Sequence, residues 1–389
     1  MIELAWQWLV DGAAALLLVP VLVLLAETLP GPARGSSCDA QRRRLAVLIP
    51  AHDEAILIAT TVRSVLSQLE PSDRLVVVAD NCSDNTAAIA AREGAEATVR
   101  TDSTRRGKGH ALDFGIRHLE LDPPEIVVIV DADCQLREGS IDRLARDCFR
   151  TGRPVQALYL MRAPRGAGLK TRIAEFAWIV RNQARPMGLH RVGLPCQLMG
   201  TGMAFPWTTI RSANLATGHI VEDLKLGLDL ARAGTAPLFC PEALVSSEFP
   251  ASNEGVSGQR ERWEHGHLGT ILSEAPRLLW HGLTRLDGNS LTLALDLGVP
   301  PLALLTLMVA GVWFVSLASG AWIAFAMASV AAALLVTSML LSWARYAKGV
   351  ISLRSLAFAA VYVLWKIPLY ARFLVSRRLN WVRAKRDGG

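Results

Sequence analysis

The chain has 389 residues, of which 51% are apolar and 20% charged, and its net charge is +6. This length predicts two or three structural units, and a composition so rich in apolar residues argues against a purely soluble protein. The six cysteines are widely spaced without a CxxC pair, which excludes a zinc-finger pattern and a disulfide framework. We therefore expect a cytosolic domain with reduced thiols, combined with membrane segments.

The first long apolar stretch covers residues 12–26 and begins after two acidic residues. Positive charge follows it, at Arg34 and at the three arginines 42–44. A secretory signal peptide would carry its positive charge before the apolar run, and the positive-inside rule places arginines on the cytoplasmic side. Residues 1–33 are therefore predicted to form an uncleaved transmembrane anchor that leads into the cytoplasm.

Between residues 45 and 250, short β-branched runs alternate with amphipathic stretches. The runs predict strands, and the stretches predict helices because their apolar residues recur at helical spacing. The expected strands are 45–50, 74–80, 96–100 and 125–131, and the expected helices are 54–69, 84–93, 107–121 and 139–149. This alternation predicts βαβ units and a mostly parallel sheet. The polar clusters AHDE, DNCSD and DADC follow three of the strands, at the sheet edge where such folds bind ligands.

Asp131 and Asp133 stand one residue apart at the end of the apolar run IVVIV. Two carboxylates so placed repel each other, and a divalent cation that prefers oxygen ligands would offset the repulsion; a solvated loop is the alternative. A P-loop and a GxGxxG fingerprint are both absent from the sequence. Haloacid-dehalogenase-like phosphatases carry such a pair on their first strand, followed by Gly-Thr, whereas here it follows the fourth strand and precedes Cys-Gln. The third chemistry is sugar transfer from a nucleoside diphosphate, in which a metal neutralises the leaving group.

Two uncharged stretches, 297–320 and 321–344, each reach the roughly 20 residues that a spanning helix needs. Their junction is short and uncharged, as is typical of an exterior turn. We expect a transmembrane hairpin over residues 291–345 that returns the chain to the cytoplasmic side.

Two further stretches are predicted to lie at the membrane surface and not to cross it. Residues 267–290 show the pattern of an amphipathic interfacial helix. In the last segment, 346–389, the apolar run is interrupted by Lys366 and Pro368 and is flanked on both sides by positive charge. This charge favours an interfacial or re-entrant segment followed by a basic cytoplasmic tail.

Seven motifs occur in the order IPAHDE, VVVADNCSDNT, RRGKGHALDFG, VDADC, GTGMAF, VEDLKLGLDL and QRERW. In this order they resemble the membrane-bound family 2 glycosyltransferases, a group that includes cellulose, chitin and hyaluronan synthases and bacterial exopolysaccharide glycosyltransferases. The resemblance implies a cytoplasmic GT-A-type, Rossmann-like domain over residues 34–266. The expected fold class is therefore α/β with a mostly parallel sheet, one N-terminal and at least two C-terminal transmembrane helices, and interfacial helices.

The resemblance assigns a donor site to residues at the ends of the strands. Asp80 would hold the uracil or ribose, with Ala51 and Asp53 lining the same pocket. Lys108 would reach the diphosphate, and Asp131 would contact the nucleotide and share the metal. The implied donor is a nucleotide sugar, with a UDP-sugar expected.

The resemblance also assigns metal, base and acceptor residues. Asp133 would coordinate Mg²⁺ or Mn²⁺ beside the first aspartate of the DxD pair. Asp223 of VEDLKLG would be the base that takes the proton of the acceptor hydroxyl. Gln259, Arg262 and Trp263 match QxxRW, in which the arginine would pair with the diphosphate and the tryptophan would face the acceptor sugar.

The predicted function is inverting, metal-dependent transfer of a sugar from a nucleoside-diphosphate sugar to a lipid-linked or saccharide acceptor, in bacterial exopolysaccharide or glycolipid synthesis. A processive β-glycan synthase is one alternative, although such enzymes usually have more membrane helices. A non-catalytic nucleotide-sugar-binding membrane subunit is another, and the intact acidic pair and QxxRW argue against it. We expect a multi-pass protein of the inner (plasma) membrane with a cytoplasmic catalytic domain and no nucleic-acid partner.

Overall fold

The computed structural model describes the backbone of residues 1–32, 40–217, 221–249 and 253–375, and the side chains of these residues except 2, 253–263, 360 and 372–375. The described chain divides into two compact units. We call them the sheet unit (40–162, 194–217, 221–249 and 253–266) and the helical unit (1–32, 163–193 and 267–375).

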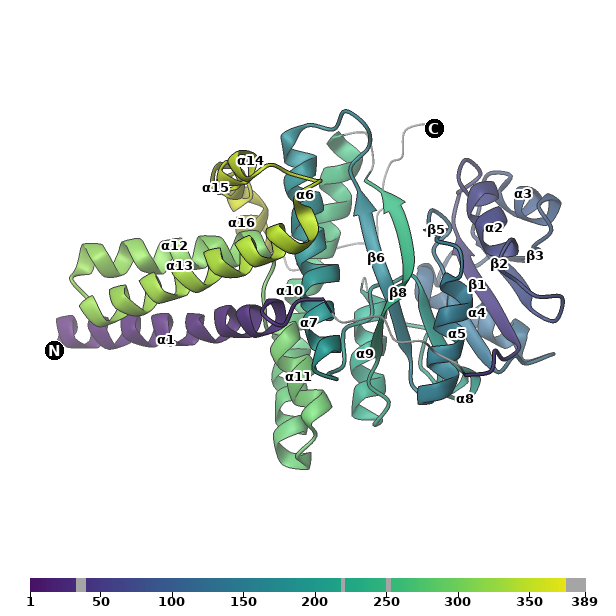
Figure 1. Cartoon of the computed structure of the whole chain (residues 1–389), viewed down its shortest axis with the longest axis horizontal. Coiled ribbons are helices and arrows are strands. Elements are labelled where there is room, and N and C mark those ends of the chain that lie inside the picture. Colours follow the sequence, from purple (N-terminus) through teal and green to yellow (C-terminus); the bar gives the residue numbers. More distant parts are fainter. Residues whose placement is uncertain (33–39, 218–220, 250–252, 376–389) are drawn as a thin grey trace. The chain divides into compact units, whose positions relative to one another are not determined.

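The sheet unit is built around an eight-stranded sheet with the order β3-β2-β1-β4-β7-β6-β8-β5 (Figure 1). Its strands are β1 Leu45–Ala51, β2 Arg74–Asp80, β3 Glu96–Arg100, β4 Ile126–Ile129, β5 Gln135–Leu136, β6 Val155–Arg162, β7 Met203–Pro206 and β8 Leu238–Glu248. Strands β3, β2, β1 and β4 are parallel, β7 is antiparallel to both β4 and β6, and β6 is parallel to β8. The expected mostly parallel sheet is confirmed, and its fully parallel half carries the polar clusters.

Strand β4 is apolar along its whole length, and all four of its residues are buried. A strand in the middle of a sheet covered on both faces requires such a continuous apolar run. The strand ends at Ile129, where its ladder with β7 also ends, so Asp131 and Asp133 lie in the turn that follows. The expected strand over 125–131 is therefore too long at its carboxyl end.

The helices that lie wholly in the sheet unit include those expected between the strands. They are α2 Ile58–Leu66, α3 Thr86–Arg92, α4 Lys108–Leu119, α5 Ser140–Thr151, α8 Trp207–Arg211 and α9 Glu222–Arg232. Helix α4 packs closely on the sheet, since a Cβ atom on Gly115 would lie 2.4 Å from Cδ1 of Leu48. Because α4 follows β3, this contact holds its first residue, Lys108, at the carboxyl edge of the parallel strands.

The helical unit contains α1 Ile2–Thr28, α6 Leu169–Ile179, η1 Val180–Ala184, α7 Arg185–Arg191, α11 Gly288–Leu297, α12 Leu302–Ser319, α13 Trp322–Ser342, η2 Trp343–Ala347, α14 Leu353–Ala357, α15 Ala359–Leu364 and α16 Ile367–Val375. The chain enters this unit again through the second part of α10 Asn253–Arg285. Four described stretches are long and apolar enough to cross a membrane: Glu3–Thr28, Leu302–Ser319, Trp322–Ala347 and Leu353–Ala371.

Helices α1, α12 and α13 lie side by side in the helical unit (Figure 1). Where α1 meets α13, buried small residues fill the contact, among them Ala14, Ala321 and Ala324. Small side chains let two helices approach closely, which is typical of packing between membrane helices.

The segments expected at the membrane surface are more divided than predicted. Residues 267–285 continue α10, and α11 begins after Asp287, whose side chain accepts hydrogen bonds from the N–H groups of Asn289 and Ser290. Residues 356–375 are shared among three short helices, α14, α15 and α16. Because this stretch also has the length and composition of a candidate span, its placement on the surface stays a prediction.

Residues 163–193, expected in the catalytic domain, belong to the helical unit. Their helix α7 touches the end of α1 so closely that a Cβ atom on Gly188 would lie 1.7 Å from the carbonyl oxygen of Glu27. Nε of Arg185 donates to Oε2 of Glu27 at 2.5 Å, and Nη2 donates to Oδ1 of Asp296 at 2.5 Å. All three charged side chains are buried. Arg185 therefore depends on the two carboxylates to balance its charge, and each carboxylate depends on Arg185.

Candidate active site

Two loops with strained backbone lie at the carboxyl edge of the sheet. Asp53 follows β1, whose last residue is the buried Ala51, and Asn81 follows β2. Both have positive φ, 52° and 51°, a conformation that Leu286 alone shares among the described non-glycine residues. The carboxylate of Asp53 accepts a hydrogen bond of 2.6 Å from the N–H of Ser83 and so ties the two loops together. Strain of this kind clusters at functional sites.

Asp80, expected at the nucleoside, is the last residue of β2 and is only 6% exposed. Its Oδ1 accepts a hydrogen bond of 2.6 Å from Nη1 of Arg100 and one of 2.9 Å from Nδ2 of Asn81. Arg100 is the last residue of β3 and the register partner of Asp80 on the neighbouring strand. The carboxylate is therefore held in one orientation by a buried ion pair.

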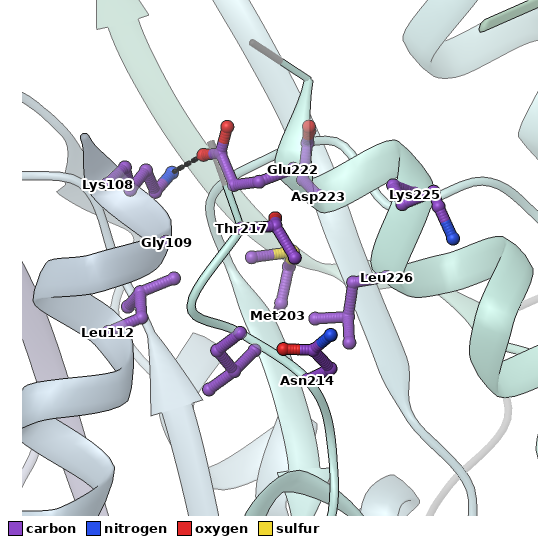
Figure 2. Close-up of a pocket in the computed structure, with 11 residues that line it drawn as sticks. Lys108, Gly109, Leu112, Met203, Asn214, Thr217, Glu222, Asp223, Lys225 and Leu226 are labelled. Carbon is purple, nitrogen blue, oxygen red and sulfur yellow. Dashed lines mark ion pairs between the residues drawn. The ribbon is translucent and has the colours of Figure 1, made fainter. Parts of the chain in front are cut away.

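Lys108 lies among three carboxylates. Its Nζ is 2.5 Å from Oδ1 of Asp131 and 4.0 Å from Oε1 of Glu222, and it donates to the carbonyl oxygen of Gly200 at 2.7 Å. Figure 2 shows the side chain extending from α4 toward Glu222. Burial lowers the pKa of Lys108, but the three carboxylates, of which Asp223 is the third, outweigh burial and raise this pKa above its ordinary value. Lys108 is thus a permanent cation where a diphosphate is expected.

Asp131, Asp133 and Cys134 could hold a metal ion, because their ligand atoms all lie within 4.8 Å of one another. Burial raises the pKa of Asp131, Lys108 opposes this effect, and the charge of Asp133 adds to it. Burial also raises the pKa of the Cys134 thiol well above its ordinary value, so the two carboxylates are the natural ligands for a hard cation. Carboxylate ligands suit Mg²⁺ and Mn²⁺, so the residues present fit the expected cation.

The loop of GTGMAF is held against the acidic pair. Oγ1 of Thr201 accepts a hydrogen bond of 3.0 Å from the N–H of Asp131, and the buried Gln156 donates from Nε2 to the carbonyl oxygen of Thr201 at 2.9 Å. Gly200 and Gly202, which flank Thr201, have positive φ angles of 93° and 64°. Glycine adopts this conformation without steric cost, so the backbone of Gly200 can lie next to Asp223 and Lys108.

Asp223 lines a pocket between α4 and α9 (Figure 2). A Cβ atom on Gly200 would lie 3.2 Å from Oδ2 of Asp223 and 3.7 Å from Nζ of Lys108, so the expected base and the expected diphosphate ligand face one stretch of backbone. Glu222 shares the pocket, and burial raises its pKa to about 7, against the effect of Lys108 and with that of Asp223. Other lining residues are Leu112, Met203, Asn214, Thr217 and Leu226.

Gln259, Arg262 and Trp263 lie on α10, in the stretch whose side chains are outside the described part of the structure. Their expected roles at the diphosphate and the acceptor sugar stay predictions. The other expected site residues come from β1 and the loop after it, β2, α4, the turn after β4 and α9, and they lie at strand ends, in loops or at helix ends.

Three residues of the site were missing from the sequence prediction. Arg100 had a recognisable signal, because it ends a predicted strand beside the strand that ends in Asp80. Glu222 precedes the predicted base, but acids are common at helix starts for their interaction with the helix dipole. Thr201 lies in the motif GTGMAF, but its contact with Asp131 had no signal, because the two residues are 70 positions apart.

Comparisons with known proteins identify the family of the chain. The family model "Glycosyltransferase like family 2" matches residues 42–266, more than half of the chain. The probable glycosyltransferase YdaM of Bacillus subtilis is 24% identical over 242 residues, which cover 59% of this chain and 56% of YdaM. The uncharacterized protein MJ1222 of Methanocaldococcus jannaschii is 30% identical over 114 residues, which cover 29% of this chain and 45% of MJ1222. The chain thus matches about half the length of these two curated relatives.

Among solved structures, the mannosyltransferase PcManGT from Pyrobaculum calidifontis, in complex with GDP-Man and Mn²⁺, aligns with 95% of this chain and 97% of its own length. The TM-score is 0.54 and the sequence identity 17%, a likeness that concerns the fold.

Proposed function

This chain belongs to the glycosyltransferase-like family 2 and is a glycosyltransferase, and we propose that it transfers a sugar, with inversion, from a UDP-sugar to a lipid-linked or saccharide acceptor in bacterial exopolysaccharide or glycolipid synthesis. The observation that carries the proposal is the arrangement of Asp223 and Lys108 around the backbone of Gly200. An inverting transfer needs a base for the acceptor hydroxyl and a cation for the leaving diphosphate, placed on one small site.

The reaction is an in-line displacement at the anomeric carbon. The acceptor oxygen forms the new bond to this carbon, and its proton passes to the carboxylate of Asp223. The bond between the anomeric carbon and the diphosphate oxygen breaks, and its electron pair leaves with UDP. Lys108 offsets part of the negative charge that develops there, and Arg262 would add a second positive charge. Attack and departure occur on opposite faces of the sugar, so the configuration inverts.

The donor would be held by residues at the ends of the first two strands. Asp80 would meet the nucleoside, and Ala51 and Asp53 would line the same pocket. Support comes from the loops that follow β1 and β2, which are tied together by the bond between Asp53 and Ser83. A site fixed in this way before the nucleotide arrives loses little conformational entropy on binding.

Asp131 and Asp133 would hold Mg²⁺ or Mn²⁺. A bound ion supplies positive charge for the donor diphosphate. The two carboxylates are ligands suited to a hard cation, and the thiol of Cys134 lies beside them. The solved complex of the Pyrobaculum mannosyltransferase with Mn²⁺ supports the same choice.

The helical unit would lie in and on the plasma (inner) membrane, with the catalytic site on the cytoplasmic side. Its apolar helices α1, α12 and α13 are the proposed spans. Helix α11 and the last part of α10 run across the direction of these three helices (Figure 1). On α10 the exposed apolar residues Leu272, Leu279, Trp280 and Leu283 recur at helical spacing. An exposed apolar face of this kind suits the membrane surface.

A screen of nucleotide sugars tests the proposal. Purified full-length protein would be incubated with UDP-, GDP- and CDP-sugars, with and without Mg²⁺ or Mn²⁺, and the release of nucleoside diphosphate would be measured. We expect metal-dependent release from a UDP-sugar, and its loss in Asp133→Asn, because an amide lacks the charge that holds a hard cation. Activity of this variant near that of the wild type at saturating Mg²⁺ would exclude the metal assignment.

A further inference from the structure

We infer that Arg100 sets the base specificity of the donor site, because it leaves Asp80 a single open acceptor oxygen that suits uracil and not guanine or cytosine. The inference rests on the proposed function, since it takes Asp80 as the residue that meets the nucleobase. The donor would be a nucleotide whose base presents a single ring N–H between two carbonyl groups.

Asp80 is a buried carboxylate with one oxygen occupied and the other open. Both of its side-chain hydrogen bonds, from Nη1 of Arg100 and from Nδ2 of Asn81, end on Oδ1. Within the described part of the chain, no hydrogen bond reaches Oδ2. The Asp80 side chain is only 8% exposed, and Oδ2 is the oxygen that remains open to solvent. It is an oxygen prepared for a donor group that comes from outside the protein.

The two groups that occupy Oδ1 are themselves fixed. Nη2 of Arg100 donates to Oδ2 of Asp102 at 3.1 Å and to the carbonyl oxygen of Arg105 at 2.8 Å. Oδ1 of Asn81 accepts from the N–H of Asp102 at 2.8 Å. Neither donor can turn away from Asp80 without breaking these bonds, so the orientation of the carboxylate is set before a nucleotide binds.

The nucleobases differ in what they offer to one acceptor oxygen. Uracil presents one ring N–H flanked by two carbonyl oxygens, so a single acceptor satisfies it and a second carboxylate oxygen would face a carbonyl. Guanine presents two neighbouring N–H donors, which both oxygens of a free carboxylate bind best. At the position of the uracil ring N–H, cytosine presents an unprotonated nitrogen, whose lone pair a carboxylate oxygen repels, and its neighbouring amino group meets the open oxygen only if the base shifts in the site. A single open oxygen therefore favours uracil over both.

The fixed orientation also predicts a reversal of specificity. In Asp80→Asn, Arg100 and Asn81 both donate, so they keep the amide oxygen on their side. The amide NH₂ then takes the place of the open oxygen and offers a donor to the base. Cytosine, whose ring nitrogen accepts, should then bind more tightly than uracil.

The experiment measures the Kd of UDP, GDP and CDP, each with Mn²⁺, for the full-length protein in detergent. We expect the wild type to bind UDP at least about tenfold more tightly than GDP or CDP. Asp80→Asn should bind CDP more tightly than UDP. Arg100→Met frees Oδ1 and should lower the preference for UDP over GDP about tenfold, whereas Arg100→Gln keeps a donor and should retain most of it. Arg74→Met is the matched control, because Arg74 pairs with Glu96 between the same two strands at their opposite ends.

Two results would overturn the inference and leave the proposed function standing. One is binding of UDP and GDP to the wild type within about threefold of each other; the other is a folded Asp80→Asn protein that still prefers UDP to CDP. If no nucleoside diphosphate binds the wild type, the proposed function fails, and the inference fails with it. If Arg100→Met does not fold, the relative affinity of Asp80→Asn for UDP and CDP still tests whether the side chain at position 80 has a fixed orientation. Arg100 and Asn81 are both present in this variant and still donate to its Oδ1.

Discussion

Nζ of Lys108 lies 2.5 Å from Oδ1 of Asp131, so the lysine expected at the diphosphate neutralises an aspartate expected at the metal. The pair joins the first turn of α4 to the turn after β4. Under the proposed function, one cation would therefore serve two partners at different stages, an aspartate in the free protein and a diphosphate in the donor complex. This exchange has consequences that can be measured separately.

Replacing Lys108 with methionine should change metal and nucleotide binding in opposite directions. Without the ammonium, Asp131 and Asp133 repel each other unopposed, and Mn²⁺ alone should bind about tenfold more tightly. UDP should bind about tenfold more weakly, because its diphosphate loses a charged partner. Titrations with Mn²⁺ and with UDP measure the two effects. Arg117→Met on the exposed part of the same helix is the control, and equal weakening of both ligands would contradict the role of Lys108.

Asp223→Asn should lower turnover about 10²-fold or more, because an amide cannot take the proton of the acceptor. Binding of the UDP-sugar should change little, since the base acts on the acceptor. Steady-state rates and the Kd of the donor separate the two effects. A parallel loss of donor binding would assign Asp223 to the donor site and place the base elsewhere.

Glu222 should make the stability of the protein depend on pH. Its pKa is raised from 4.5 to about 7 in the folded protein. The folded protein therefore keeps a proton that the unfolded chain loses above about pH 4.5, and stability falls as pH rises through the window between these two values. Glu222→Gln removes this loss, so its Tm relative to the wild type should rise between about pH 5 and pH 7 and then level off. Glu138→Gln, at an exposed site, should show no such rise, and an identical trend in both variants would refute the assignment.

Gly188→Ala should destabilise the helical unit. The added Cβ atom would lie 1.7 Å from the carbonyl oxygen of Glu27, so α7 and α1 must separate. Overpacking of this kind costs about 1–3 kcal/mol or more, which would appear as a lower Tm in detergent. Gly168→Ala is the matched control, since a Cβ atom there meets nothing within 4 Å. Equal Tm values for the two variants would show that the contact is not tight in the protein.

The chain end after α16 should be cytoplasmic. As a membrane hairpin, helices α12 and α13 would return the chain to the side where Arg345, Lys348 and Arg354 stand, and a further crossing would bury Lys366 at a cost of roughly 2.5–3.5 kcal/mol. A reporter that fluoresces only in the cytoplasm, fused after Gly389, should therefore be bright. A dark fusion, together with a bright one placed after Lys348, would mean that the stretch from Leu353 to Ala371 crosses the membrane.

Local patterns in the sequence were sufficient for most of the sheet unit. The strands ending at Ala51, Asp80 and Arg100 and the helices between them were predicted within a few residues, because hydrophobic period and turn composition are properties of neighbouring residues. The acidic pair after β4 could be recognised for the same reason, since two carboxylates at the end of a buried strand stand out locally. The long apolar helices α12 and α13 could also be predicted, because each corresponds to an uncharged stretch of sufficient length.

The tertiary structure alone decided which polar groups meet. Arg100 and Asp80 are 20 residues apart in sequence, Thr201 and Asp131 are 70 apart, and Arg185 and Glu27 are 158 apart. An arginine at a strand end or a glutamate near a helix end has the same local pattern whether it is solvated or buried against a partner. Its partner depends on how distant elements pack, and burial then makes the pairing obligatory, because an isolated charge in the interior is too costly to keep.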